Sequence, residues 1–196
     1  MTERKAAVTR ETAETNVKVE LNIDGSGQFQ ITTGIRIFDH FLAQLAQHGV
    51  FDVKISASGT DQHHVVEDVA ISLGKAFNQA LGKKQGIVRM AHTVVPMDEA
   101  LAMVVVDIGG RVYSVIEATF NRATIGDLDA DLIRHFLVSF ASEAKINLHA
   151  RIFSGINDHH KAEALFKALA RAMDTATRVD ERLVGNVPST KEVIEG

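Results

Sequence analysis

Alternation of apolar and polar residues predicts where the strands of the first half lie. Residues 16–23 alternate cleanly, as a half-buried strand does, and residues 51–57 alternate in the same way. The turn residues 24–27 follow the first of these strands, so we expect residues 28–32 to return as its hairpin partner. Residues 4–10 are predicted to form a short edge strand.

Helical spacing of apolar residues replaces this alternation in two segments of the first half. One helix is predicted from Ile35 to Gly49, where the glycine ends it. A second is predicted from about His64 to Leu81, before Gly82. The first half therefore reads strand-strand-helix-strand-helix.

The second half repeats this order, with an irregular tail over residues 185–191. Two similar halves, 1–90 and 91–196, indicate an α+β fold with an internal duplication. Tight hairpins imply mainly antiparallel sheets with helices on one face. The elements expected in the second half are a strand over 100–107, its hairpin partner over 112–120, a helix over 128–144, a strand over 146–152 and a helix over 159–179.

Composition narrows the classes of partner. The 196 residues carry a net charge of −4, which argues against nucleic acid or an anionic membrane as the main partner. There is no cysteine, so metal ligands must come from histidine and carboxylates. Neither a membrane-spanning apolar run nor a signal peptide is evident, and we expect a cytoplasmic protein.

A repeated histidine motif carries the candidate chemistry. Each half contains His-His-x-x-Glu at the start of a predicted helix, and each has a further histidine 23 or 24 residues upstream. A single His-His pair is usually a solvated surface feature, but two copies in register indicate a duplicated metal site. The ligands expected are His40, His63, His64, Glu67, His135, His159, His160 and Glu163.

Helix geometry divides these ligands between two ions. Residues three apart share a helix face, so His64 is expected to act with Glu67, and His160 with Glu163. The other histidine of each pair then points elsewhere and can reach a second ion. Imidazole and carboxylate ligands without sulfur suit Mn²⁺, Fe²⁺ or Zn²⁺, and open positions on a six-coordinate ion favour Mn²⁺ or Fe²⁺.

Other candidate residues give weaker signals. His48, His92 and His149 have no counterpart in the other half, and each alone is more typical of a surface or supporting histidine. Glu14 reads as an ordinary exposed carboxylate. Cations and hydroxyls suited to a phosphate are Arg89, Arg111, Lys167, Ser189, Thr190 and Lys191.

The ordered motifs along nearly the whole chain resemble those of the imidazoleglycerol-phosphate dehydratase family of histidine biosynthesis. The matching segments are 38–40, 47–52, 63–68, 96–101, 110–111, 159–168 and 188–191. The resemblance implies two similar α/β halves of the ribosomal S5 domain 2-like type. It also implies a homo-oligomer of 24 subunits that binds two Mn²⁺ per subunit.

The resemblance also implies how the site residues are shared. One ion would take His40, His64, Glu67 and His159, and the other His63, His135, His160 and Glu163. The other substrate contacts implied are Glu14, His48, Arg89, Arg111, Lys167, Ser189, Thr190 and Lys191, with the cations and the hydroxyls on the phosphate.

The implied reaction removes water from the glycerol side chain to give imidazole-acetol phosphate. Metals would act as Lewis acids on the substrate's imidazole, and a carboxylate would move a carbon-bound proton. Glu14 is the first candidate for that base, since the other catalytic candidates, Glu67 and Glu163, are expected to be tied up as ligands.

Two positions depart from the family pattern. The segment before the first histidine pair is short, with Gln62 where a second aspartate is usual, and Gly109 replaces a serine. Neither change removes a ligand.

Two other functions fit the same ligands. A dinuclear metallohydrolase would need a metal-bridging water and no imidazole in its substrate. A metal-storage assembly is disfavoured, because such carboxylate-histidine proteins are all-helical bundles.

Overall fold

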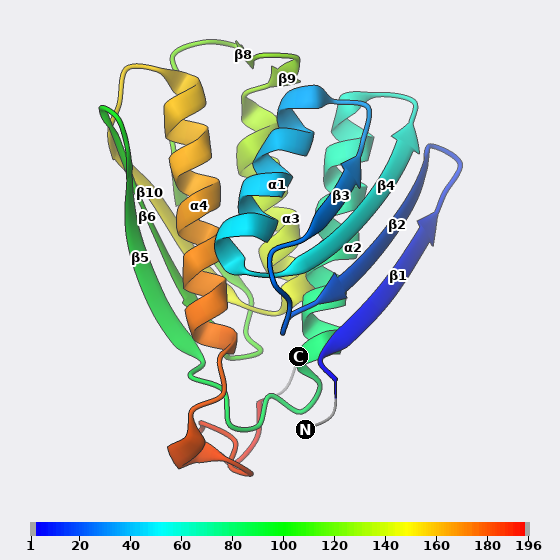
Figure 1. Ribbon diagram of the computed structural model, residues 1–196. Coiled ribbons are helices and arrows are strands. Elements are labelled where there is room, and N and C mark those ends of the chain that lie inside the picture. The colour runs from blue at the N-terminus through cyan, green and yellow to red at the C-terminus, as the bar shows by residue number, and fades with distance from the viewer. Residues whose placement is uncertain (1–2, 195–196) are drawn as a thin grey trace.

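A computed structural model describes residues 3–194, in which two four-stranded sheets enclose four helices (Figure 1). This arrangement confirms the predicted α+β class with helices against one face of each sheet. The second sheet begins at Met90. The helices are α1 (Arg36–Gly49), α2 (Gln62–Leu81), α3 (Asp131–Ala144) and α4 (Asp158–Thr177).

The first sheet has the order β1-β2-β4-β3. Its strands are β1 (Lys5–Glu11), β2 (Thr15–Asn22), β3 (Phe29–Thr32) and β4 (Asp52–Gly59). The hairpin expected between β2 and β3 was wrong, because β3 pairs in parallel with β4. Asp52 explains the path, since its Oδ1 accepts the backbone N–H groups of Ser26 and Gln28 at 2.7 and 3.1 Å.

The second sheet repeats this topology with the order β5-β6-β10-β7. Its strands are β5 (Met90–Met97), β6 (Ala100–Asp107), β7 (Tyr113–Glu117) and β10 (Asn147–Ser154). The hairpin expected between β6 and β7 was also wrong, because β7 pairs in parallel with β10. The edge strand predicted over residues 4–10 is β1. Its counterpart β5 was not predicted, because apolar residues also lie on its exposed side, at Met90 and Val94.

The helices of one half pack against those of the other, α1 on α4 and α2 on α3. Phenylalanines join them: the ring of Phe136 on α3 lies 5.6 Å from Phe38 on α1 and 5.1 Å from Phe166 on α4, between centroids. Phe77 on α2 meets Phe140 on α3 at 5.6 Å. All five rings are almost fully buried, so the two halves share one core.

Helix α1 ends at Gly49 as predicted, although for a different reason, and α3 begins later than predicted. Gly49 is the last residue of α1, and Val50 takes the left-handed conformation that ends the helix, with φ of 58°. Gly49 is needed for space instead, since a Cβ there would lie 2.3 Å from the Phe51 ring. Helix α3 starts later than expected because a small hairpin, β8 (Thr124–Ile125) and β9 (Leu128–Asp129), precedes it. Asp127 in this hairpin accepts the first N–H groups of α1.

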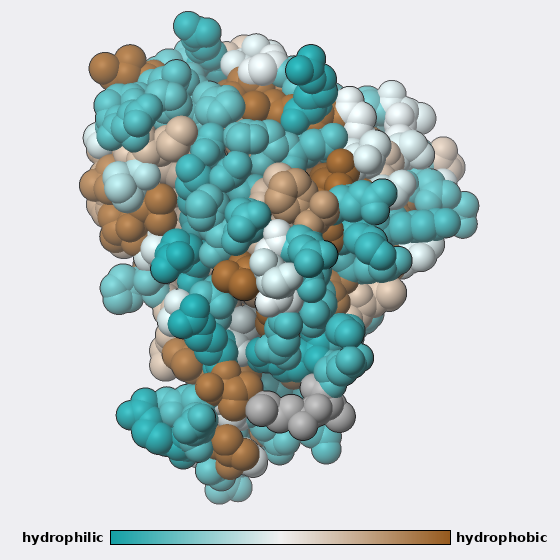
Figure 2. Space-filling model, in the orientation of Figure 1, coloured by the Kyte–Doolittle hydropathy of each residue, from teal (hydrophilic) through white to brown (hydrophobic). Residues whose placement is uncertain are grey.

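The surface differs between the two sheets. Polar side chains cover the middle of the face shown in Figure 2, and apolar ones gather at its left margin, where the second sheet lies. Exposed apolar residues on that sheet include Met90, Val94, Tyr113 and Phe153. Within residues 3–194, no helix combines the length and apolarity needed to cross a membrane.

The closest approach of α2 to α3 gives a test of the core. A Cβ on Gly74 would lie 2.6 Å from the carbonyl oxygen of Phe140 and 2.9 Å from the amide nitrogen of Ala144, both backbone atoms. Alanine gains about 1 kcal/mol over glycine in helix propensity, but overpacking a core costs about 1–3 kcal/mol. We therefore expect Gly74→Ala to lower the urea midpoint of unfolding.

The control is Lys75→Ala at the neighbouring, half-exposed position of the same helix. Its midpoint should stay at or above that of the unsubstituted protein. An unchanged or raised midpoint for Gly74→Ala would show that the two helices separate without cost.

Candidate metal and substrate site

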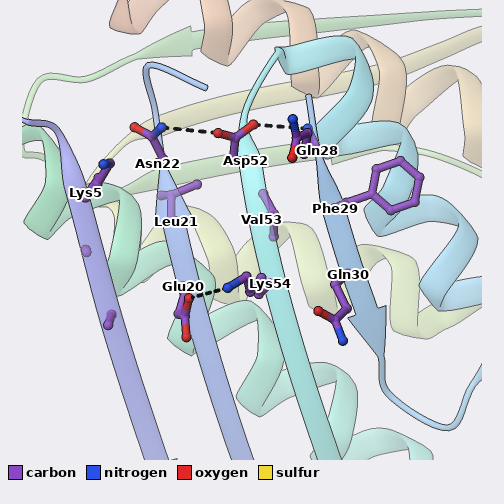
Figure 3. A pocket seen from close by; sticks show the side chains of 12 residues that line it. Lys5, Glu20, Leu21, Asn22, Gln28, Phe29, Gln30, Asp52, Val53 and Lys54 are labelled. Atoms are coloured by element: carbon purple, nitrogen blue, oxygen red, sulfur yellow. Dashed lines mark hydrogen bonds and ion pairs between the residues drawn. The ribbon is translucent and has the colours of Figure 1, made fainter. Parts of the chain in front are cut away.

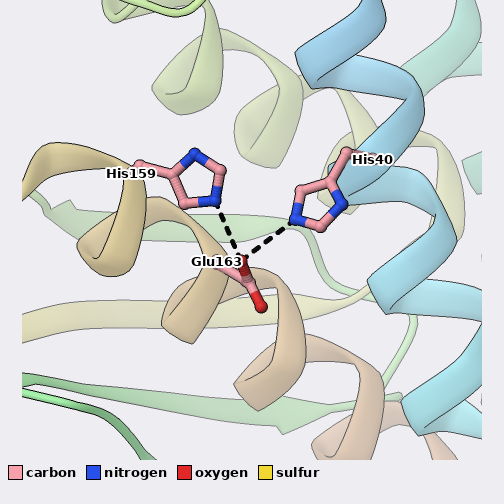
Figure 4. Close-up of side chains that lie close together, drawn as sticks. All are labelled: His40, His159 and Glu163. Carbon is pink, nitrogen blue, oxygen red and sulfur yellow. Dashed lines mark hydrogen bonds and ion pairs between the residues drawn. The ribbon is translucent and has the colours of Figure 1, made fainter.

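One three-residue cluster lies between α1 and α4. His40 and His159 each place Nε2 3.0 Å from Oε2 of Glu163, and their rings are 5.4 Å apart between centroids (Figure 4). The Glu163 side chain is 7% exposed, whereas the histidines are about two-fifths exposed. A buried carboxylate thus faces two imidazoles that remain open on the other side.

The second cluster repeats this geometry between α2 and α3. His135 Nε2 lies 3.3 Å from Oε1 of Glu67, and the His135 ring stacks on His63 at 4.6 Å. His63, Glu67 and His135 offer ligand atoms all within 4.8 Å of one another, as do the three residues of the first cluster. Each cluster combines an upstream histidine from one half with a motif from the other.

The second histidine of each pair faces a hairpin instead of a cluster. His64 Nε2 lies 3.4 Å from Glu14 Oε2, and His160 Nδ1 lies 2.8 Å from Glu99 Oε2. Within the chain, the glutamate three residues on lies with the first histidine of each pair, so the predicted sharing of an ion by the second histidine and that glutamate stays a prediction. The first histidine, His63 or His159, is four residues before the glutamate, and this spacing also places the two side chains on one helix face.

The groupings observed within one chain differ from the ligand sets implied by the resemblance. Glu67 lies with His63 and His135, and Glu163 lies with His40 and His159. The two carboxylates are thus exchanged relative to the expected sets. The four helices begin at the same end of the bundle (Figure 1), and all eight predicted ligands lie in the first two turns of a helix.

Helix caps hold the histidine pairs in place. Asp61 Oδ1 accepts the backbone N–H of His64 at 3.0 Å, and Asn157 Oδ1 accepts that of His159 at 2.9 Å. Gln62, which stands where an acid was usual, accepts the N–H of Asp129 at 3.2 Å. The short segment before the first motif therefore ties α2 to the β8–β9 hairpin of the other half.

Glu163 is held ionised. Burial opposes its ionisation, but Lys167 and the two histidines of the cluster outweigh burial and lower the pKa of Glu163 to about 2. Lys167 Nζ lies 2.6 Å from Glu163 Oε1 and 3.5 Å from the sulfur of Met97. In this chain the predicted phosphate ligand Lys167 is thus the neighbour of a cluster carboxylate.

Two hairpin glutamates occupy equivalent positions, and the sequence singled out only Glu14. Glu14 lies in the turn between β1 and β2, and Glu99 lies in the turn between β5 and β6. Glu99 is 36 residues before His135, whereas Glu14 is 26 before His40, because the second half contains the extra β8–β9 segment. Aligning the halves by their hairpins rather than by spacing would have found Glu99.

The two glutamates differ in how they are bound. Hydrogen bonds from His160 and from the backbone N–H groups of Asn157 and Ile156 lower the pKa of Glu99 to about 2. Glu14 contacts His64 and is 56% exposed. Glu99 therefore links a hairpin to α4 through three bonds, whereas the carboxylate of Glu14 pairs with His64 and is largely exposed.

Most predicted phosphate ligands lie at the other end of α4. Arg89 donates from its backbone N–H to the carbonyl of Ala176, near the C-terminus of that helix. Its guanidinium binds Asp107 at 2.7 and 3.1 Å and the carbonyl of Pro188 at 2.7 Å, which anchors the tail that carries Ser189, Thr190 and Lys191.

Gly109 leaves room for this anchor. A Cβ there would lie 3.0 Å from the guanidinium of Arg89 and from Asp107. Arg111, two residues on, is exposed and its carbonyl accepts a hydrogen bond from Asn147.

The histidines without a counterpart belong to neither three-residue cluster. His92 and His149 are exposed on the second sheet, which confirms the expectation of surface positions. His48 lies near the end of α1 and contacts Gln44 at 3.1 Å. Burial lowers the pKa of His48, and the positive charges of Lys167 and Arg171 lower it further.

A hollow of about 730 Å³ on the outer face of the first sheet lacks the chemistry of a site. It is lined by no histidine. Lys54 pairs with Glu20 at 3.2 Å, and Asp52 accepts a hydrogen bond from Asn22 at 3.3 Å (Figure 3). The histidine clusters are therefore the candidate site.

Known proteins match both the sequence and the fold. Residues 33–173 match the family model of imidazoleglycerol-phosphate dehydratase. A dehydratase of this name from Dehalococcoides mccartyi is 57% identical over 195 residues, covering 100% of both chains. One from Methanothermobacter thermautotrophicus is 52% identical over 97% of this chain and 98% of that protein.

Solved structures agree with these relatives. Crystal structures of the dehydratases from Staphylococcus aureus and Pyrococcus furiosus each give a TM-score of 0.83, at 30% and 33% identity. They cover 90% and 95% of this chain and 99% of their own. The chain belongs to the imidazoleglycerol-phosphate dehydratase family, the hydro-lyases that dehydrate imidazoleglycerol phosphate in histidine biosynthesis.

Proposed function

We propose that the dehydration depends on two Mn²⁺ ions per subunit, held by the two histidine clusters. The observation that carries this proposal is the pair of equivalent clusters, each with two imidazoles and one carboxylate. Three such ligands leave coordination positions open on an octahedral ion, and their nitrogen and oxygen donors suit Mn²⁺.

A buried atom supports a metal at the α2–α3 cluster. Nε2 of His135 is buried and has no hydrogen bond of good geometry within the described chain, although Glu67 and His63 lie beside it. A buried, unsatisfied ring nitrogen is costly unless a ligand takes its lone pair. The residues present therefore fit a cation.

The roles of base and metal ligand fall to different carboxylates of the chain. The chemistry that bound Mn²⁺ supplies is Lewis acidity toward the substrate's imidazole ring. Glu14 is the proposed base that takes the carbon-bound proton, because its carboxylate is exposed and lies beside His64 without being part of a cluster. Glu67 and Glu163 are occupied as ligands, and Glu99 is bound by three donors.

The proposed phosphate ligands imply that two copies build each site. His159 and Ala176, where Arg89 binds, are 17 residues apart on α4, which is about 25 Å at 1.5 Å per residue. A substrate of one imidazole ring and a phosphorylated three-carbon chain cannot span that distance. We therefore propose that Arg89, Arg111 and the 188–191 tail of one subunit serve the clusters of another, in a cytoplasmic homo-oligomer of 24 subunits.

The dehydration assay tests the proposal directly. Protein stripped of metal with a chelator should not turn over imidazoleglycerol phosphate, and added Mn²⁺ should restore product formation. Turnover that is equal with and without metal would refute the metal dependence. Absence of turnover in both states would refute the proposed reaction for this chain.

Metal analysis tests the ligands. His135→Ala should lower the bound metal by about one ion per chain, because it leaves the α2–α3 cluster with two ligands. The matched control is His149→Ala, which changes an exposed histidine on β10. Equal losses for the two variants would contradict the assignment.

Steady-state kinetics test whether Arg89, which anchors the 188–191 tail, contributes to substrate binding. Arg89→Met removes the bonds to Asp107 and Pro188, so we expect KM to rise about tenfold, or about 1.4 kcal/mol of binding, with kcat little changed. Arg151→Met, which changes an arginine paired with the exposed Glu117, is the control. A fall in kcat at unchanged KM would show that Arg89 does not act through substrate binding.

A further inference from the structure

Asp68 is a buried carboxylate on α2 that the proposed mechanism does not use. It follows Glu67, is 5% exposed, and faces the first sheet instead of the clusters. Its Oδ1 lies 2.6 Å from Nε of Arg10 on β1, and its Oδ2 accepts the hydroxyl of Thr15 at the start of β2. The second half has Ala164 at the matching position, so the duplicated cluster geometry does not require this carboxylate.

A chain of hydroxyls leads from Asp68 to the backbone of Glu14. Oγ1 of Thr15 lies 3.1 Å from Oγ1 of Thr12, which also accepts the backbone N–H groups of Glu14 at 3.1 Å and Thr15 at 3.0 Å. An ionised carboxylate only accepts, so Thr15 donates to Asp68 and Thr12 donates to Thr15. The lone pairs of Thr12 then accept the two amide N–H groups. Each hydrogen bond in the series from Glu14 to Asp68 therefore has a defined donor and acceptor.

The other side of the same turn is also fixed. The carbonyl of Glu14 accepts the N–H of Thr60 at 3.0 Å. A Cβ at Gly59 would lie 3.1 Å from that carbonyl and 2.7 Å from Val65 on α2, so only glycine lets β4 pass this close. Both peptide groups of Glu14 are therefore held, while its carboxylate is largely exposed and lies 3.4 Å from Nε2 of His64.

We propose that Asp68 is a positioning residue that acts through Thr15 and Thr12 to set the carboxylate of Glu14 against the α2 histidines. This inference rests on the proposed function, in which Glu14 takes the substrate's proton. Helix α2 carries both Asp68 and the cluster residues His63 and Glu67. The turn that holds Glu14 is therefore bonded to the same helix that would hold the metal ion. The Glu99 hairpin shows the alternative, in which the carboxylate itself makes the bonds and is no longer free.

The test replaces the Thr15 hydroxyl with a methyl group of the same shape. Thr15→Val with Mn²⁺ should lose roughly 10- to 100-fold in kcat, because a displacement of about 1 Å at a reacting group has effects of that size. KM should stay within about threefold, since substrate binding is not touched, and bound Mn²⁺ per chain should not change. Thr15→Ser, which keeps the hydroxyl, should restore most of kcat, and Asp68→Asn should resemble Thr15→Val.

Two controls separate positioning from general damage. Thr9→Val makes the same substitution at an exposed position of the same hairpin and should leave kcat unchanged. In a Glu14→Gln background, Thr15→Val should cost less than about twofold, because residues that act through one another are not additive. Hydrogen exchange of the peptide around residues 12–15 should be faster in Thr15→Val than in Thr9→Val, which reports the turn without any turnover.

Several outcomes would overturn the proposal. They are a kcat of Thr15→Val equal to that of the unsubstituted enzyme, an equal loss in the Glu14→Gln background, or unchanged hydrogen exchange. Failure of the proposed function is distinguishable, because there the unsubstituted protein with Mn²⁺ already gives no product.

Discussion

The packing of each half's helices against those of the other half is the interaction on which the rest of the structure depends. Phe136 links α1, α3 and α4, and Phe140 links α3 to α2. Burying one such ring contributes about 1.5–3 kcal/mol, so the interface between the halves is as hydrophobic as a core. Each cluster takes its upstream histidine from one half and its other two ligands from the other half, and therefore exists only when this packing is complete.

The duplicated scaffold then allows equivalent positions to differ. At the α1–α4 cluster Lys167 accompanies a buried Glu163, while Glu67 at the α2–α3 cluster is 35% exposed. Asp68 in the first half is matched by Ala164, and Val65 by Lys161, which pairs with the buried Asp158 at 2.8 Å. The shared residues give two similar ligand sets, and the unshared ones fix different neighbouring segments, the β1–β2 turn in one half and residues 121–122 in the other.

The sequence predicted what local spacing controls and failed where distant segments decide. Helices and the α+β class follow from periodicity, and the His-His-x-x-Glu repeat identified both glutamates of the clusters. The strand with which β3 pairs depends on Asp52, which accepts hydrogen bonds from two backbone amides just before β3, and no local pattern reveals this contact. The geometry of each cluster depends on which histidine of the pair, three or four residues before the glutamate, lies beside the histidine from the opposite half.

A free but well-placed carboxylate is hard to obtain from side-chain bonds alone. Each hydrogen bond that orients a carboxylate also stabilises its ionised form and makes it a weaker base, as for Glu99 and Glu163, whose pKa values lie near 2. The turn that carries Glu14 is instead held through the backbone, by Thr12 on one side and Thr60 on the other. The buried Asp68 bears the desolvation in its place and receives Arg10 as a counter-charge. In the proposed mechanism, one carboxylate, Asp68, therefore orders the turn, and a different one, Glu14, takes the proton.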